Sequence, residues 1–121
     1  MPKKALIVDD SVTIRQMVSF TLRQAQFDVV EAENGADALK KLASLTPDLI
    51  VTDLNMPVMD GLTFIRGARA LPSAKYIPIL MLTTESQAEK KVQAKAAGAT
   101  GWIVKPFDPA QLLAVIGKVV P

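Results

Sequence analysis

The chain predicts an α/β fold in which five parallel strands form one doubly wound sheet in the order 2-1-3-4-5, with five helices around it. Short aliphatic runs alternate along the chain with segments whose apolar residues recur at helical spacing. The first, third and fourth runs are almost continuously apolar, which is typical of parallel strands buried on both faces. Right-handed crossovers leave few ways to connect such units, and the order 2-1-3-4-5 is a common one.

Five short runs carry the predicted strands. They lie near residues 4–9, 28–32, 48–53, 77–83 and 101–105. Each run has the usual length of a strand in a globular protein. The alternation with helical segments is regular, and no internal repeat or linker interrupts it. The chain therefore predicts a single domain over residues 1–121.

Five segments are predicted to be helical. They cover residues 12–25, 36–45, 61–71 and 85–97, and a last segment that begins at Asp108-Pro109 and continues through Val119. The apolar stripe of the first helix is broad and consists of Val12, Ile14, Met17, Val18, Thr21 and Leu22. The stripe of the fourth helix contains only Ala88, Val92 and Ala96. Gly98 follows it as a C-terminal glycine, and the last helix opens with an aspartate N-cap and a proline.

Composition excludes several classes of protein. Half of the 121 residues are hydrophobic and 21% are charged, which excludes a disordered chain. No apolar run approaches the ~20 residues that span a bilayer, and the N-terminus does not resemble a signal peptide, so we expect a cytoplasmic protein without a membrane partner. Cysteine and histidine are absent, which excludes disulfides, thiolate ligands and an imidazole base. The net charge of +2 does not support nucleic-acid binding.

Charged residues follow three of the predicted strands at the point where each strand ends. Asp9 and Asp10 follow the first strand, Asp53 follows the third, and Lys105 follows the fifth. In a 2-1-3-4-5 sheet the winding reverses between strands 1 and 3, and ligands bind in the crevice at the carboxyl ends of these strands. We therefore expect the three acids and the amine to share one crevice.

Three crowded carboxylates are unfavourable without a cation. Each raises the pKa of the others, and a hard divalent ion such as Mg²⁺, which prefers oxygen ligands, relieves the repulsion. The alternative is purely structural: Asp9-Asp10 caps the helix that begins near Ser11, and Asp53 only ends a strand. The metal site is favoured because no base lies near the acids in sequence to neutralise them.

Four strings of residues resemble the signature blocks of response-regulator receiver domains. They are Ile7-Val8-Asp9-Asp10-Ser11, Asp53-Leu54-Asn55-Met56-Pro57-Val58-Met59-Asp60-Gly61, Leu82-Thr83-Thr84 and Lys105-Pro106-Phe107. They occur in the usual order and at the usual spacing, and the chain is most similar to the single-domain, chemotaxis-type (CheY-like) branch. The resemblance implies a flavodoxin-like receiver fold without an output domain, acting as a phosphorylation-dependent switch in two-component signalling.

The resemblance implies a role for each acid. Asp53 is the expected phosphoacceptor, which takes a phosphoryl group from the phosphohistidine of a histidine kinase or phosphotransfer protein. Asp10 and Asp53 are expected to ligate Mg²⁺ directly, Asp9 through a bound water, and Asn55 through its backbone carbonyl. Mn²⁺ is expected to substitute for Mg²⁺. Such a protein is not a classical enzyme, because it catalyses only its own phosphorylation and dephosphorylation at Asp53.

Lys105 and Thr83 complete the catalytic group that the resemblance implies. Lys105 is expected to pair with one phosphoryl oxygen, and the Thr83 hydroxyl to donate a hydrogen bond to another. Phosphoryl transfer depends on positioning and charge neutralisation more than on covalent help, and an amine, a hydroxyl and a metal supply both. The resemblance also implies a cis peptide bond between Lys105 and Pro106.

The expected output surface surrounds Trp102 and the fourth helix. Thr83 and Trp102 occupy the places of the receiver switch pair, where family members more often have tyrosine or phenylalanine instead of tryptophan. Indole is larger and has no hydroxyl, so Trp102 is alternatively a fixed partner-binding surface or simple packing. The lysines of the fourth helix, Lys90, Lys91 and Lys95, suit an acidic partner peptide or form an ordinary solvated face.

Two further positions bear on the lifetime of the signal. Asn55 and Glu85 occupy positions that tune the loss of the phosphoryl group in the family, and we expect a short-lived modification of the chemotaxis type. Glu85 also falls in the first turn of the predicted fourth helix, where its charge suits the helix dipole. The expected partner is a downstream protein, with the flagellar motor switch as one candidate, and the protein is expected to be a monomer.

Other functions remain open on the sequence. A single-domain relay or phosphate-sink receiver of another pathway has the same residues. A Mg²⁺-dependent aspartate-nucleophile phosphatase normally needs a second aspartate two residues after the nucleophile, where this chain has Asn55. A flavodoxin-like electron carrier needs a Ser/Thr/Gly-rich phosphate loop, where Asp9-Asp10 would repel a flavin phosphate. A receiver-shaped binding module that is never phosphorylated is the least economical, because every acceptor residue is present.

Overall fold

The computed structural model describes residues 2–120, and these residues form a five-stranded parallel sheet. The strands are β1 (Lys4–Val8), β2 (Asp28–Ala32), β3 (Leu49–Thr52), β4 (Ile79–Thr83) and β5 (Gly101–Val104). Their order is β2-β1-β3-β4-β5, which confirms the predicted topology and the flavodoxin-like α/β fold. The helices are α1 (Val12–Gln24), α2 (Gly35–Leu42), α3 (Gly61–Arg69), the 3₁₀ helix η1 (Pro72–Ala74), α4 (Ala88–Ala97) and α5 (Pro109–Val119). Within residues 2–120, no helix has the length and apolar character needed to cross a membrane.

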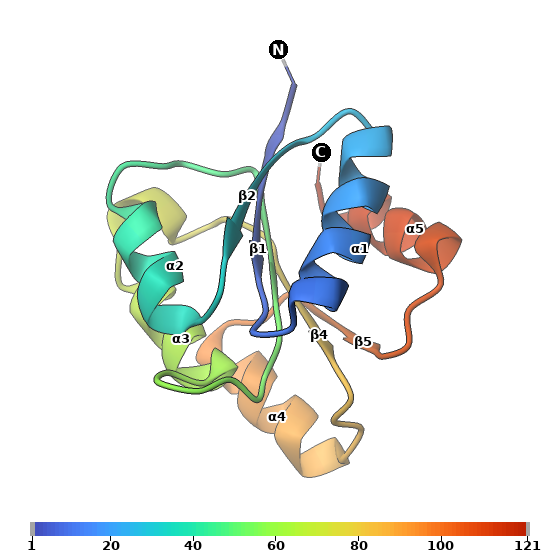
Figure 1. Cartoon of the computed structure of the whole chain (residues 1–121). Helices are drawn as coiled ribbons and strands as arrows, with labels where there is room; N and C mark the ends of the chain where they lie inside the picture. The colour runs from blue at the N-terminus through green and yellow to red at the C-terminus, as the bar shows by residue number, and fades with distance from the viewer. Residues whose placement is uncertain (1, 121) are drawn as a thin grey trace.

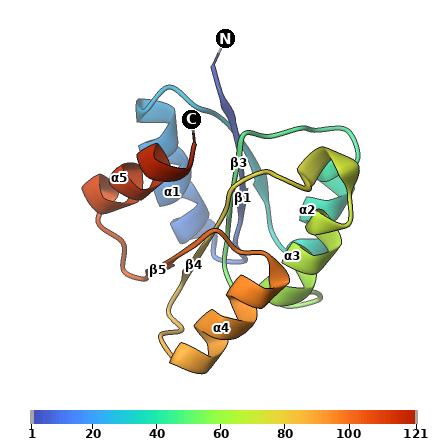
Figure 2. The ribbon, with the colours of Figure 1, turned by 180° about the vertical axis from the view of Figure 1, so that it is seen from behind.

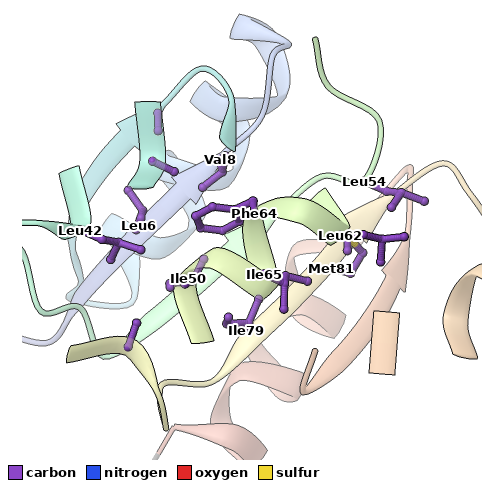
Figure 3. Close-up of a cluster of buried hydrophobic side chains, with 14 of the residues drawn as sticks. Leu6, Val8, Leu42, Ile50, Leu54, Leu62, Phe64, Ile65, Ile79 and Met81 are labelled. Carbon is purple, nitrogen blue, oxygen red and sulfur yellow. The ribbon is translucent and has the colours of Figure 1, made fainter. Parts of the chain in front are cut away.

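The helices cover both faces of the sheet. α1 and α5 lie together on one face, and α2, α3 and α4 lie on the other (Figures 1 and 2). Alternate residues of a strand therefore point into different cores. In β1, Leu6 and Val8 belong to the core beneath α2 and α3, which Figure 3 shows together with Phe64 of α3. Ala5 and Ile7 belong to the core beneath α1 and α5.

The register of the central strands brings their carboxyl ends together. Val8 at the end of β1 pairs with Thr52 at the end of β3, and Thr52 pairs with Met81 of β4. β3 and β4 are buried along their whole length because helices cover both of their faces. The residues that follow β1 and β3 therefore emerge side by side at the edge where the sequence predicted the functional site.

All the helices begin and end within a turn of their predicted bounds, and the largest differences are three residues, at the end of α2 and at the start of α4. α4 begins at Ala88 and not at residue 85. In the preceding loop, the Thr83 hydroxyl accepts a hydrogen bond from the N–H of Glu85, and the Glu85 carboxylate accepts one from the N–H of Gln87. Such local bonds to side chains compete with helix formation. Glu85 therefore lies before α4 and not in its first turn.

Two predicted apolar stripes are partly wrong. In α1, Val12 and Met17 are 55% and 49% exposed, whereas Ser19 is buried. In α4, Val92 is 68% exposed, and Ala94 is the residue that the helix buries. In α1 the predicted stripe is broader than the face that packs, and in α4 a few small side chains offer too little apolar area to decide which face packs. Contacts with neighbouring elements decide the orientation instead.

Candidate active site

Three acids meet at the carboxyl end of the sheet. Asp9, Asp10 and Asp53 each contribute a carboxylate oxygen to a group whose members lie within 4.8 Å of one another. Backbone bonds hold the two chain segments in place, because the N–H of Asp53 donates to the Val8 carbonyl over 2.9 Å and the N–H of Asp9 donates to the Ala32 carbonyl over 3.2 Å. Asp9 and Asp53 are buried, whereas Asp10 is exposed. The fold thus brings together the three acids that the sequence singled out.

The Lys105 amine lies between two of these acids. Its Nζ donates to Asp9 Oδ2 over 2.8 Å and to Asp53 Oδ2 over 3.2 Å, and only 10% of its side chain is exposed. The N–H of Lys105 donates to the Thr83 carbonyl, which ties the end of β5 to the end of β4. The peptide bond between Lys105 and Pro106 is cis. Lys105 directly follows β5, and its two hydrogen bonds show that the amine enters the crevice from that side.

Burial and charge act in opposite directions on these groups. Burial raises the pKa of the Asp9 carboxyl, and the hydrogen bond from Lys105 only partly opposes the rise. Burial also disfavours the charged Lys105 amine, but its hydrogen bond to Asp9 and the charge of Asp53 outweigh this effect and raise the pKa of Lys105. The two directions are compatible because one amine serves two acids, while Asp53 repels Asp9. A single lysine does not neutralise three carboxylates.

The donor set fits a hard divalent cation. Mg²⁺ is usually bound through one or two carboxylates, together with other oxygen ligands and several waters. Asp10 and Asp53 offer oxygens that lie close together, with Asp9 beside them. The crevice carries an excess of negative charge over the one amine, and a divalent cation offsets this excess. Asp9 and Asp53 each accept from Lys105 and from one backbone N–H, whereas residues 2–120 give the Asp10 carboxylate no hydrogen bond, so Asp10 has the carboxylate most free to bind a metal.

The loop between β3 and α3 fixes the position of the Asp53 side chain through backbone hydrogen bonds. The N–H of Leu54 donates to Asp53 Oδ1 over 2.7 Å, and the N–H of Gly61 donates to the Leu54 carbonyl over 2.7 Å. A Cβ on Gly61 would collide with the carbonyl oxygen of Asp53, so only glycine lets α3 begin this close to the strand end. Asn55, the predicted carbonyl ligand, lies in the same loop and is exposed.

Thr83, Glu85 and Trp102 form a chain of hydrogen bonds next to the crevice. The buried Thr83 hydroxyl accepts from the N–H of Glu85 over 3.3 Å. The carbonyl of the same Glu85 accepts from the indole Nε1–H of Trp102 over 3.1 Å. Trp102 is half-buried and packs against the core beneath α2, α3 and α4. The sequence singled out all three residues, but nothing in it indicated that Glu85 joins the other two.

Sequence reasoning missed one side chain that contacts the acids. Arg15 of α1 donates from Nη1 to the carbonyl oxygen of Asp9 over 2.6 Å, and its Nε pairs with Glu31 of β2 over 3.3 Å. The helical pattern placed Arg15 outside the apolar stripe, yet only 15% of its side chain is exposed. The one signal in the sequence is its position: an arginine about one turn into a helix that directly follows Asp9 and Asp10.

The chain is similar to known signalling proteins over nearly its whole length. The family model of the response regulator receiver domain matches residues 5–117. Chemotaxis protein CheY-3 of Vibrio cholerae is 41% identical over 117 residues, which cover 96% of this chain and 90% of that protein. Chemotaxis protein CheY1 of Helicobacter pylori is 43% identical over 111 residues, 90% of each chain.

A solved structure agrees with these relatives. The crystallised chemotaxis protein CheY4 of Vibrio cholerae superposes with a TM-score of 0.95 and 50% sequence identity, and the match covers 98% of this chain and 99% of that one. The acids of the crevice and Lys105 lie within the residues that the family model matches. This chain therefore belongs to the response regulator receiver domain family of two-component signalling, and chemotaxis CheY proteins are among its relatives.

Proposed function

We propose that the protein is a phosphorylation-dependent switch that accepts a phosphoryl group on Asp53 from the phosphohistidine of a histidine kinase or phosphotransfer protein. The observation that carries the proposal is the position of Lys105, whose amine hydrogen-bonds Asp9 and Asp53 at once within a group of three acids. Receiver domains generally bind Mg²⁺ and exchange signals with histidine kinases and downstream targets, and the family membership supports the same chemistry here.

The contacts of Asp53 suit it to the role of acceptor. The N–H of Leu54 holds its Oδ1, and the amine of Lys105 holds its Oδ2. The carboxylate is thus fixed in one orientation before a donor arrives, which is the positioning that phosphoryl transfer needs. After transfer, Lys105 pairs with an oxygen of the new phosphoryl group, and the Thr83 hydroxyl, which accepts from the N–H of Glu85 before transfer, donates to another.

In this proposal Asp10 and Asp53 hold Mg²⁺ directly, Asp9 holds it through water, and the Asn55 carbonyl completes the protein's share of the ligands. When bound, Mg²⁺, or Mn²⁺ in its place, neutralises charge that develops on the phosphoryl oxygens. The excess of carboxylates over amines in the crevice supports this assignment. Asn55 and Glu85 are further proposed to tune how long the phosphoryl group lasts before the protein removes it.

The backbone of Glu85 offers a route from the site to the surface. Its N–H bonds to Thr83 and its carbonyl bonds to the indole of Trp102. When Thr83 turns to the phosphoryl group, the peptide groups of Glu85 lose one of their two anchors, and Trp102 responds to the change. Trp102 fluorescence, measured with and without a stable phosphoryl mimic, tests this step. No change in intensity, wavelength or quenching would remove Trp102 from the route.

The proposed docking surface for a downstream protein lies between α4 and β5. A pocket of about 260 Å³ there is lined by residues that include Lys91, Lys95 and Trp102. Two lysines beside an apolar floor suit an acidic peptide. The chemotaxis relatives make a protein of the flagellar motor switch one candidate for this partner, and the protein is proposed to act as a monomer.

Mass spectrometry tests the central step. The protein is incubated with Mg²⁺ and a small-molecule phosphodonor, and we expect a gain of about 80 Da, the mass of one HPO₃ group. Asp53→Asn should abolish the gain. Asp28→Asn is the matched control, because Asp28 is an exposed acid in β2, outside the crevice, and its variant should be modified as the original protein is. An adduct that survives Asp53→Asn would refute the assignment of the acceptor.

A further inference from the structure

Arg15 ties together three segments at the carboxyl end of the sheet. Its backbone N–H donates to the Ser11 carbonyl in the first turn of α1. Its guanidinium donates to the carbonyl oxygen of Asp9 over 2.6 Å and pairs with Glu31 of β2 over 3.3 Å. Only 15% of the side chain is exposed. The guanidinium is therefore held in one place and makes its shorter bond to the peptide group that joins Asp9 to Asp10.

Asp10 depends on this peptide group for its position. In residues 2–120 no hydrogen bond or ion pair to the Asp10 carboxylate is found, and the residue is exposed. Asp9, by contrast, is held by Lys105 and by the N–H of Ser11. Repulsion from Asp9 and Asp53 drives an unrestrained Asp10 carboxylate out towards solvent. What keeps Asp10 near the crevice is therefore the backbone, which Arg15 holds at the Asp9 carbonyl.

We propose that Arg15 is a positioning residue for the cation site: by fixing the Asp9 carbonyl it holds Asp10 where it can share a divalent ion with Asp53. The inference rests on the proposed function only in assigning a Mg²⁺ site to the crevice. Residues that orient metal ligands from behind typically change metal affinity by 10–100-fold when they are removed, and the bond of Arg15 to the ligand backbone is of this kind.

The positive charge of Arg15 and its proposed positioning role predict opposite changes in Mg²⁺ affinity when Arg15 is removed, so a measurement of that affinity distinguishes them. The guanidinium is a positive charge close to the acids, and Glu31 is its partner. Removing it leaves Glu31 unpaired and makes the region more negative, which favours cation binding. A loss of Mg²⁺ affinity on removal of Arg15 therefore cannot come from charge. It requires that the side chain positions a ligand.

The experiment is a calorimetric titration with Mg²⁺ alone, without a phosphodonor. In Arg15→Met the aliphatic stem stays and the donors go, and we expect Mg²⁺ to bind about tenfold more weakly. Arg15→Met/Glu31→Gln restores the local charge balance and should bind as weakly or slightly more weakly. Arg23→Met is the matched control, because Arg23 is an exposed arginine at the other end of α1, and its variant should keep the original affinity.

Each outcome decides between the alternatives. Unchanged or tighter Mg²⁺ binding by folded Arg15→Met overturns the inference. If Arg15→Met does not fold, Arg15→Lys decides, because one amine cannot hold the Asp9 carbonyl and Glu31 in the geometry of the guanidinium. We expect Arg15→Lys to bind Mg²⁺ more weakly than the original protein, and equal affinity would overturn the inference. If the original protein binds Mg²⁺ but Asp53 is not modified by the phosphodonor, only the assignment of Asp53 as phosphoacceptor is refuted. If the original protein binds no Mg²⁺, both the proposed function and the role of Arg15 are refuted.

Discussion

α3 and α4 are neighbours on the same face of the sheet, yet they are held in very different ways (Figure 2). α3 buries Leu62, Phe64, Ile65 and Ala68 in the core, whereas the one fully buried residue of α4 is Ala94. Because burial of apolar side chains is the main source of stability, α3 is an integral part of the core and α4 lies on its margin. α3, which follows the Asp53 loop, is thus the more firmly packed of the two helices, and α4, next to Trp102, is the less firmly packed.

The ends of the two helices sharpen this contrast. The Asp60 side chain caps the start of α3 by accepting from the N–H of Thr63 over 2.8 Å, whereas Gln87 gives α4 no side-chain cap. At its other end α4 is anchored, because Arg69 donates twice to the Gly98 carbonyl, over 3.1 and 2.8 Å. α4 is therefore held at its C-terminus and loosely held at its N-terminus, the end nearer to Glu85. Such an arrangement suits a helix whose N-terminal end shifts when the state of the site changes.

The largest expected difference between the helices lies in their buried side chains. Phe64→Ala in α3 should lower the free energy of unfolding by about 3–5 kcal/mol, because it opens a cavity in the core. Val92→Ala in α4 should change it by less than about 0.5 kcal/mol, since Val92 is 68% exposed. Urea denaturation measures both. Equal losses in the two variants would mean that α4 is packed as firmly as α3.

Removing the anchor of α4 should have the next largest effect. Arg69→Met removes the bonds to Gly98 and those to the Ala74 and Ile77 carbonyls, and we expect a loss of about 2–3 kcal/mol. Amide hydrogen exchange in α4 should become faster in this variant, and the increase should be larger in α4 than in α3. Arg66→Met is the control, because Arg66 lies on the same helix and is exposed. If exchange in α4 is the same in both variants, Arg69 is not its anchor.

Substitution of the glycine at the end of α4 should change the free energy of unfolding by a smaller amount. Gly98 has a φ of +118°, and a Cβ there would lie 2.9 Å from the Arg69 side chain. Gly98→Ala should therefore cost about 1–2 kcal/mol. Gly117 in α5 is the opposite case, because a Cβ there would meet nothing within 4 Å, and Gly117→Ala should stabilise the protein by about 0.4–1 kcal/mol. Thermal unfolding that moves in the same direction for both variants would contradict this account.

The smallest effect is expected at the uncapped end of α4. Gln87→Asp introduces a good N-cap residue and should stabilise α4 by about 0.5–1 kcal/mol, with slower hydrogen exchange in its first turn. Gln87→Ala is the control and should leave exchange unchanged. If this end moves in signalling, Gln87→Asp should also reduce the change in Trp102 fluorescence caused by a phosphoryl mimic. If the fluorescence change in Gln87→Asp is as large as in the original protein, the start of α4 takes no part in the response of Trp102.

Sequence patterns alone predict the alternation of strands and helices, the order of the sheet and the position of the acids at strand ends. These features are local, or follow from general rules of connection, so that Asp9 and Lys105 could be placed together although 96 residues separate them. The caps were equally local: Asp108 begins α5, and Gly98 ends α4 with a positive φ. No assembled structure was needed for any of them.

Which helix faces are buried and which distant polar groups meet depends on how the elements pack in the folded protein. Val92 faces solvent and Ala94 the core because neighbouring elements, and not the weak stripe of α4, choose the buried face. The bonds of Arg69 to Gly98 and of Trp102 to Glu85 join residues 29 and 17 positions apart, and no local pattern in the sequence predicts them. A hydrogen bond requires an acceptor within about 3 Å, and a pattern of residue types carries no such distance. For the same reason Arg15 lay outside every predicted site until the fold placed it against the Asp9 carbonyl.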